Sequence, residues 1–193
     1  MKRIVVVAAL ESEYFSIQGP IKKIYYTGIG KINSARVTTE LILEVKPDLI
    51  LNVGTAGCLR KDLLGQVFGS NEVIERDMIA EPLAPRGTVP LSDQLPVLKS
   101  SFGTARCATG DSFVTSRDQW LLDNQVDLVD MELFAIAKVS NKLGVPCMAI
   151  KFGSDLANSD ASIDWKKSLD NARSLLSEKI RNSLDLVGKI NIS

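Results

Sequence analysis

The sequence predicts an α/β fold with a mostly parallel sheet that helices cover on both faces. Runs with strand character alternate along the chain with runs of helical spacing. The first run, Lys2–Leu10, is apolar on both faces, which is typical of a strand inside a covered sheet. The 193 residues suffice for a sizeable core, and no repeat or interdomain linker divides them. We therefore expect residues 1–193 to form a single domain.

Composition and charge exclude several classes of protein. Lys plus Arg and Asp plus Glu both number 23, so the basic excess of a general nucleic-acid binder is missing. Histidine is absent, which excludes Ser-His-Asp catalysis and histidine metal sites. The apolar run Ile4–Leu10 is too short to span a membrane and has no cleavage site after it. Cys58, Cys107 and Cys147 are widely spaced, which predicts reduced thiols and a cytoplasmic setting.

The first half of the chain predicts a strand, a helix and a second strand, at Lys23–Thr27, Lys31–Lys46 and Asp48–Val53. The glycine-rich turn before the helix has Asn33 where a dinucleotide loop has its third glycine, so a plain strand-to-helix turn is favoured. The small residues Gly54–Gly57 follow the second strand. They either let a ligand approach the backbone closely or form a simple turn.

The second half predicts four strands and two long helices, at Glu72–Arg76, Ala105–Thr109, Val126–Met131, Glu132–Leu143, Pro146–Phe152 and Asp164–Val187. The segment from Asp77 to Gly103 is either a functional excursion or holds short elements. Ser116 and Gln119 predict a capping box for a further short helix. An apolar stripe on the last helix is assigned to the core, and comprises Trp165, Leu169, Ala172, Leu176, Ile180, Leu184 and Val187.

Three carboxylates, Glu13, Glu132 and Asp155, each stand where a predicted strand ends. Ligands of open α/β sheets bind at such ends, although Glu13 also fits a solvated loop and Glu132 a helix first turn. If the three converge, mutual repulsion keeps at least one protonated near neutral pH. An acid and a base in one cleft suit glycosidic bond cleavage, whereas three ionised carboxylates suit Mg²⁺. Phe113 and Val114, after a Gly-Asp turn, either cover an aromatic ligand or make a core contact.

Six segments, which span nearly the whole chain, form one set: AALESEY (8–14), TGIGKINSA (27–35), LNVGTAG (51–57), ATGDSFV (108–114), VDMELFAIA (129–137) and VPCMAIKFGSDLA (145–157). In this order they resemble the purine nucleoside phosphorylase and nucleosidase superfamily, in particular the 5'-methylthioadenosine/S-adenosylhomocysteine nucleosidases. The resemblance implies a three-layer α/β/α sandwich with a parallel or mixed sheet, assembled as a homodimer.

The resemblance also implies roles for the three carboxylates. Glu13 matches the family's acid that activates the attacking water. Glu132 matches the acid that binds the ribose hydroxyls and favours an oxocarbenium-like transition state. Asp155 matches the acid that supplies a proton toward N7 of the leaving purine. The substrate-binding residues that the resemblance implies are Met131 on the sugar, Phe113 and Val114 on the base, Ser154 beside the acid, and the lining residues Thr55, Ala56 and Gly57.

The chain departs from the family pattern in three places. It is short within 15–22, Leu133-Phe134 replaces small residues after the glutamate, and Lys151 stands where arginine is usual. These positions bear on the 5' end of the sugar pocket and on the exact substrate.

We expect an enzyme that hydrolyses a small purine nucleoside without a cofactor or metal, and that contacts neither nucleic acid nor membrane. A purine nucleoside phosphorylase and a non-catalytic nucleoside-binding protein are the alternatives. Phosphorolysis calls for a cation or an array of backbone donors beside the sugar, and neither Leu10–Glu13 nor Leu51–Gly57 contains a cation. Lys31 and Arg60 are the cations nearby in sequence. A dinucleotide-dependent oxidoreductase fits poorly, because the glycine motif is incomplete.

Overall fold

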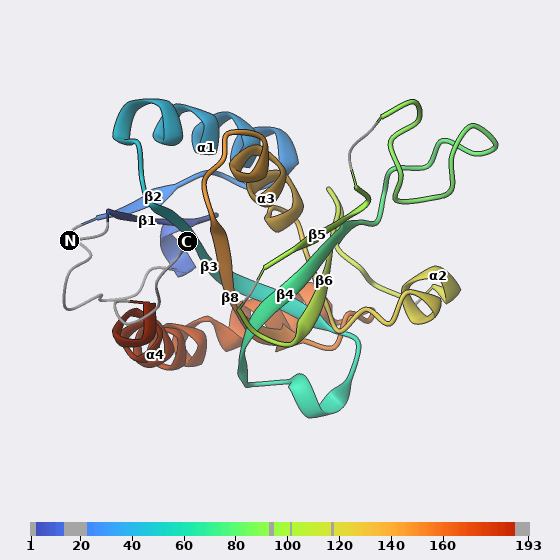
Figure 1. Cartoon of the computed structure of the whole chain (residues 1–193). Helices are drawn as coiled ribbons and strands as arrows, with labels where there is room; N and C mark the ends of the chain where they lie inside the picture. Colours follow the sequence, from blue (N-terminus) through green and yellow to red (C-terminus); the bar gives the residue numbers. More distant parts are fainter. Residues whose placement is uncertain (1–2, 14–22, 93–94, 101, 117, 188–193) are drawn as a thin grey trace.

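A mixed β-sheet with helices on both sides forms the framework of the protein (Figure 1). The computed structural model describes residues 3–13, 23–92, 95–100, 102–116 and 118–187. Within that part of the chain the strands are β1 (Ile4–Ala8), β2 (Ile24–Tyr26), β3 (Leu49–Cys58), β4 (Val67–Glu75), β5 (Val97–Lys99), β6 (Ala105–Thr109), β7 (Leu128–Asp130) and β8 (Cys147–Asp155). The helices are α1 (Lys31–Val45), α2 (Gln119–Asp123), α3 (Leu133–Lys142) and α4 (Ala161–Val187), with short 3₁₀ turns η1 (Glu11–Glu13) and η2 (Lys61–Leu63).

Strand pairing closes part of the sheet on itself. The strand order is β2-β1-β3-β7-β6-β4-β5, and β8 pairs with both β3 and β4. The pairings β3–β8–β4–β6–β7–β3 therefore form a closed circuit, with β1 and β2 extending it beyond β3. The β1–β3, β3–β8 and β4–β6 pairs are parallel, while β3–β7 and β4–β8 are antiparallel. The ends of β3, β7 and β8 consequently meet in one place.

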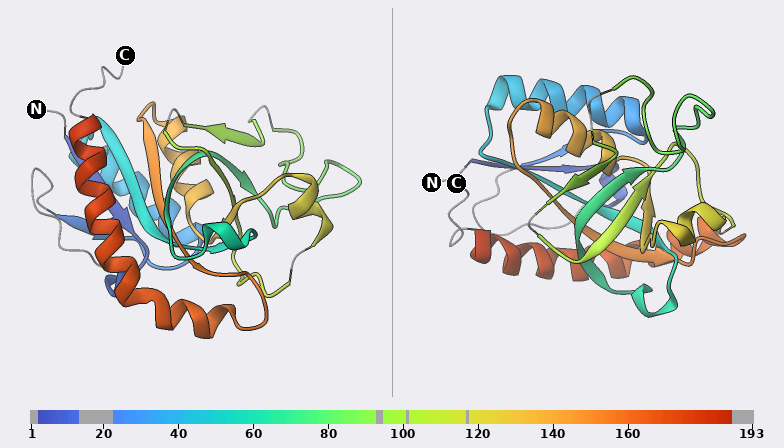
Figure 2. Two further views of the ribbon diagram at one scale, coloured as in Figure 1. Left: turned by 90° about the horizontal axis from the view of Figure 1, so that it is seen from below. Right: turned by 45° about the vertical axis from the view of Figure 1, so that its right-hand side comes forward.

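The alternation of side chains along β1 explains the layers of the fold. Val5 and Val7 pack against α1 and α3, whereas Val6 and Ala8 pack against the buried stripe of α4. Figure 1 shows α1 and α3 above the sheet and α4 below it, and Figure 2 shows α4 crossing that face. Both faces of the strand are buried, so the predicted covered sheet is confirmed. No helix in the described ranges combines the length and the apolar character needed to cross a bilayer.

Two strands run past the C-terminal ends that the sequence predicts, and β4 begins at Val67, ahead of the predicted Glu72. Gly54–Gly57, for which a close approach to a ligand and a simple turn were both open, continues β3, and Gly153–Asp155 continues β8. The two stretches pair with each other, and this pairing holds small residues in an extended conformation that isolated propensity does not favour. The extension carries Thr55 and Asp155 out along the sheet to the edge where the strands meet.

Several local expectations need correction. The capping box from Ser116 is wrong: Asp118 is the N-cap of α2, and its side chain accepts a hydrogen bond from Leu121 N at 2.9 Å. Glu132 precedes α3 as its N-cap and is not its first helical residue. The segment 77–103 contains the short strand β5.

The core assignment of the α4 stripe holds for Ala172, Leu176 and Ile180, which are fully buried. It is wrong for Trp165, whose indole lines a pocket. The side chains of Leu184 and Val187, and the segment 15–22, lie outside the described residues.

Candidate active site

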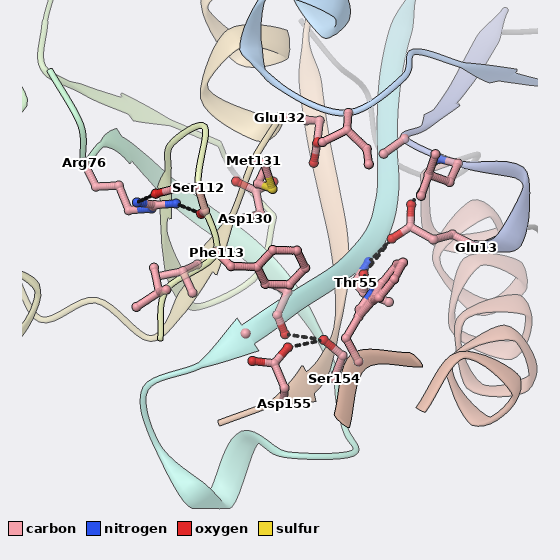
Figure 3. Close-up of a pocket in the computed structure, with 18 residues that line it drawn as sticks. Glu13, Thr55, Arg76, Ser112, Phe113, Asp130, Met131, Glu132, Ser154 and Asp155 are labelled. Atoms are coloured by element: carbon pink, nitrogen blue, oxygen red, sulfur yellow. Dashed lines mark hydrogen bonds between the residues drawn. The ribbon is translucent and has the colours of Figure 1, made fainter. Parts of the chain in front are cut away.

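One pocket of about 310 Å³ opens where the ends of β3, β7 and β8 meet (Figure 3). Its size lies within the range of small-molecule sites. All ten residues that the sequence singled out line it, namely Glu13, Thr55, Ala56, Gly57, Phe113, Val114, Met131, Glu132, Ser154 and Asp155. They come from η1, from three strand ends and from the loop after β6. The topology thus brings together positions that are up to 142 residues apart, from Glu13 to Asp155.

Glu132 can face the pocket because neighbouring side chains accept the hydrogen bonds of the first backbone N–H groups of α3. Asp130 Oδ2 accepts a hydrogen bond from Leu133 N at 2.9 Å, and Thr109 Oγ1 accepts one from Phe134 N at 2.9 Å. The Glu132 side chain makes no capping bond of its own. Its Oε1 atom instead accepts a hydrogen bond from Gly30 N at 2.9 Å. A carboxylate that is only 7% exposed is therefore free to face a ligand.

The electrostatic environment of Glu132 favours its protonated form. Burial, followed by the negative charge of Asp130, raises its pKa from 4.5 to about 7. Lys151 and the Gly30 N–H oppose this rise. A carboxyl group that titrates near neutral pH is characteristic of functional sites.

Glu13 is held at the opposite side of the pocket from Arg76 (Figure 3). Its Oε1 atom accepts hydrogen bonds from Thr55 N at 3.0 Å and from Thr55 Oγ1 at 2.6 Å. Its Oε2 atom accepts one bond from Leu10 N, at 3.3 Å. The side chain is 4% exposed, so these donors replace the solvent that a carboxylate requires.

Asp155 ends β8 on the floor of the pocket. Ser154 Oγ donates to Asp155 Oδ2 at 2.7 Å, and Ala157 N donates to Oδ1 at 2.9 Å. Burial raises the pKa of Asp155 above its usual value, although these two donors counteract the rise. A Cβ atom at Gly57 would lie 2.9 Å from Asp155 Oδ1, so the close approach of β3 to this carboxyl group requires glycine.

The remaining wall of the pocket is largely apolar. Val114 and Val129 are buried there. Phe113 and Ile29 stand at the mouth of the pocket, with 49% and 47% of their surface exposed. Met131 lies between Asp130 and Glu132 on the same wall (Figure 3). A flat aromatic group could therefore bind beside Phe113 with its polar edge directed at Asp155.

Sequence reasoning missed two prominent lining residues. Trp165 donates from Nε1 to Thr55 Oγ1 at 2.9 Å, and its ring meets that of Phe113 edge to face at 6.3 Å. Arg76 follows β4 directly and donates from Nη1 to Ser112 Oγ at 3.1 Å and from Nη2 to Gly110 O at 2.9 Å. Arg76 was the last residue of the predicted strand Glu72–Arg76, and a charged residue at that end was the available signal, since polar residues there often face a site.

The cations that sequence reasoning flagged are engaged elsewhere. Lys31 Nζ contacts Glu75 at 2.6 Å and Asp77 at 2.5 Å, and Arg60 pairs with Asp62 and Asp127. Neither residue lines the pocket. Lys151, the departure from the family pattern, is enclosed against Asp130. Leu133 and Phe134 point into the core beside Leu128 and do not narrow the pocket.

The three carboxylates differ in what holds them. Glu13 accepts three hydrogen bonds, Glu132 accepts one, and Asp155 accepts two. Within the described ranges, His, Cys, Asp and Glu side chains form no group of three that is arranged to hold a metal ion. The pocket therefore places a carboxyl group held by three donors, Glu13, and two carboxyl groups with raised pKa values, Glu132 and Asp155, around one apolar space. Such a combination can both remove and supply a proton.

The sequence is similar to those of known proteins from one family. The model of the phosphorylase superfamily matches residues 16–185. A 5'-methylthioadenosine/S-adenosylhomocysteine nucleosidase from Staphylococcus aureus is 34% identical over 168 residues, which cover 76% of this chain and 73% of the relative.

Solved structures share the fold. A Helicobacter pylori MTAN mutant with 5'-methylthioadenosine in the active site superposes with a TM-score of 0.86 at 21% identity, covering 96% of this chain and 99% of that one. The futalosine hydrolase of Helicobacter pylori gives 0.85 at 22% identity, with 95% and 97% covered. From its sequence and its architecture, this chain belongs to the phosphorylase superfamily, among the relatives of the 5'-methylthioadenosine/S-adenosylhomocysteine nucleosidases.

Proposed function

We propose that this protein hydrolyses the N-glycosidic bond of a purine nucleoside and releases the purine and a ribose derivative. The observation that carries the proposal is that Glu13, Glu132 and Asp155 reach one pocket from three separate elements. The names of the relatives suggest 5'-substituted adenosines, such as 5'-methylthioadenosine and S-adenosylhomocysteine, as the substrate class. In this proposal the whole chain serves as one nucleosidase domain.

Departure of the purine requires an acid. As the C1'–N9 bond breaks, its electron pair passes to the purine ring, and a proton delivered to N7 neutralises the developing charge. Asp155 is assigned this role because it lines the pocket at the end of β8, where burial raises its pKa above the ordinary value. Ser154, hydrogen-bonded to Asp155, orients the carboxyl group.

The sugar that remains carries positive charge shared between C1' and the ring oxygen. Glu132 is assigned to bind the ribose hydroxyls, and its negative charge stabilises the cation. Hydrogen bonds from those hydroxyls favour the ionised carboxylate and so counteract the burial that raises its pKa. Met131 supplies the apolar surface under the sugar.

Water completes the reaction. Glu13 is assigned to accept a proton from a water molecule. The oxygen of that water bonds to C1', which gives the free sugar. Three donors hold Glu13 in place, and its Oε2 atom, with one 3.3 Å bond, keeps capacity for a further proton donor. Thr55, Ala56 and Gly57 line the path between Glu13 and Asp155, while Phe113 stacks on the base and the backbone of Val114 reads its edge.

Charge favours water over phosphate as the nucleophile. Glu13 would repel an anion beside the sugar. Of the cations in the described ranges, Arg76 lines the pocket, but its Nη groups are bonded to Ser112 and Gly110 across the pocket from Glu13. A phosphorylase requires a free cation or a set of backbone donors near the reacting carbon.

We further propose that the protein acts as a homodimer in the cytoplasm. The family resemblance supports the dimer, and so do the apolar side chains of Ile29 and Phe113, which remain half-exposed at the pocket mouth. The three free cysteines suit a reducing compartment. Light scattering at micromolar concentration should give twice the 21.0 kDa chain mass; the monomer mass would contradict the dimer.

The experiment that tests the proposed function is a base-release assay on adenosine, inosine, 5'-methylthioadenosine and S-adenosylhomocysteine. We expect the two 5'-thio nucleosides to be cleaved with the highest kcat/KM. Binding of all four without release of any base would instead identify a nucleoside-binding protein. Preference for inosine would contradict the adenosine substrate class while leaving hydrolysis intact.

A further inference from the structure

A chain of hydrogen bonds connects helix α4 to Glu13. Trp165 Nε1 donates to Thr55 Oγ1 at 2.9 Å, and Thr55 Oγ1 donates to Glu13 Oε1 at 2.6 Å. The Thr55 backbone N–H donates to the same Oε1 atom at 3.0 Å. All three residues line the pocket.

The chemistry of the groups sets the direction of this chain. An indole N–H can only donate, and an ionised carboxylate can only accept. Thr55 Oγ1 therefore accepts from Trp165, and its single hydroxyl hydrogen is directed to Glu13. Without the indole N–H, the hydroxyl loses the partner that fixes its orientation. The bond from Thr55 to the ionised oxygen is charge-assisted, so its loss is felt at the carboxylate.

The same chain distinguishes the two oxygens of Glu13. Oε1 is occupied by the hydroxyl and the backbone N–H of Thr55, whereas Oε2 has one longer bond from Leu10 N at 3.3 Å. Anchoring Oε1 leaves Oε2 as the oxygen with room for water. A base must be held in place to within a fraction of an ångström for efficient proton transfer.

We propose that Trp165 is a positioning residue for Glu13 and acts through the Thr55 hydroxyl. This inference rests on the proposed function, in which Glu13 takes the proton of the attacking water. Trp165 also contacts Phe113 edge to face, at 6.3 Å between ring centroids. Its ring and its N–H thus serve different parts of the pocket and can be separated by mutation.

Trp165→Phe keeps an aromatic ring and removes only the N–H donor. We expect kcat to fall about threefold to tenfold, the effect of one neutral hydrogen bond, with KM changed by less than about twofold. Trp120→Phe is the matched control, because Trp120 packs on Arg86 and does not line the pocket. If Trp165 served only to shape the pocket wall, Trp165→Phe would raise KM and leave kcat unchanged. That result would overturn the proposal.

A double-mutant cycle tests the route of the effect. Thr55→Val removes the hydroxyl, so adding Trp165→Phe should cost no further kcat, since the two changes break one chain. Thr55→Ser keeps the hydroxyl, and in that background Trp165→Phe should again lower kcat. Multiplicative losses in the Thr55→Val background would show that Trp165 does not act through Thr55, and would overturn the proposal.

Glu13→Gln separates failure of this inference from failure of the proposed function. If Glu13→Gln abolishes turnover while Trp165→Phe matches the unmodified protein, only the positioning role is wrong. If Glu13→Gln retains turnover, the assigned base is wrong, and the positioning role fails with it. Thermal unfolding of each variant establishes that the comparison is made between folded proteins, and Thr55→Ser and Trp165→Phe are the least disruptive pair.

Discussion

Lys151 Nζ lies 2.7 Å from Asp130 Oδ2, and the two side chains are only 2% and 1% exposed. Asp130 also accepts hydrogen bonds from Thr109 Oγ1 and from the backbone of Leu133. The ion pair thus joins β8 to the junction of β7 and α3, two residues before Glu132. Burial opposes the charge on Asp130, but Lys151 and the hydrogen bonds from Thr109 and Leu133 hold the pKa of Asp130 below its ordinary value.

This pairing predicts a large loss of stability when one partner is removed. Lys151→Met should lower the free energy of unfolding by about 3–5 kcal/mol, because it leaves a buried carboxylate without its counter-charge. Chemical denaturation measures the change. Adding Asp130→Asn to Lys151→Met should recover part of the loss, and a single-mutant loss below about 1 kcal/mol would contradict the account. Arg36→Met, at an exposed pair with Glu40, is the control and should cost at most about 1 kcal/mol.

Glu132 predicts a second, pH-dependent effect on stability. Its pKa is raised from 4.5 to about 7 in the folded protein, so folding favours the protonated form. Ionisation of Glu132 therefore destabilises the folded protein. This effect begins as pH rises through the pKa of Glu132 in the unfolded chain and is complete above its pKa in the folded protein. Glu132→Gln should therefore stabilise the protein at about pH 8, by roughly 2–3 kcal/mol, and much less near pH 5. Thermal unfolding of the variant and the unmodified protein across this pH range measures the difference in stability. A difference that does not change with pH would refute the raised pKa of Glu132.

Asp155 predicts a dependence on the leaving group. Asp155→Asn should lower kcat by roughly 10²–10⁴ for a nucleoside whose purine must be protonated to leave. A p-nitrophenyl riboside releases p-nitrophenolate, a stable anion that needs no proton to leave, so the same variant should lose less than about tenfold on it. Parallel assays of the two substrates make the comparison. Equal losses on both would remove Asp155 from the role of acid.

Glu13 predicts a loss of chemistry without a loss of fold. Glu13→Gln should lower kcat by roughly 10²–10⁴ with little change in KM, because the base acts in the transition state. Glu11→Gln is the matched control: Glu11 lies in the same 3₁₀ turn but is exposed and does not line the pocket. Steady-state kinetics compare the two variants. Similar turnover by both would contradict the assignment of Glu13 as the base.

Much of this architecture could be predicted from the sequence. Strand and helix periodicities are local, and the covered sheet follows from strands such as β1 that are apolar on both faces. The convergence of Glu13 and Asp155 was accessible because the parallel strands β1, β3 and β8 present their ends at one edge. Glu132 reaches the same place by another route, because β7 runs antiparallel to the end of β3. Element ends were harder, since Gly54–Gly57 has turn composition and pairing with β8 makes it a strand.

The contacts that support the site could not be predicted in the same way. Trp165 falls on the spacing of the buried α4 stripe, yet the helix passes over the pocket at that turn, and only the fold shows it. Lys151 interrupts an apolar strand, but nothing local indicates that its partner is Asp130, 21 residues away. Such pairs are set by tertiary packing, which periodicity does not encode.

The nature of the nucleophile distinguishes hydrolysis from phosphorolysis. Base release from the preferred nucleoside should be followed in phosphate-free buffer and again with millimolar phosphate, and the sugar product identified. We predict the same rate in both and a free 5'-substituted ribose, because Glu13 repels an anion and suits water. Strict dependence on phosphate, with a sugar 1-phosphate as product, would contradict the account and identify a phosphorylase.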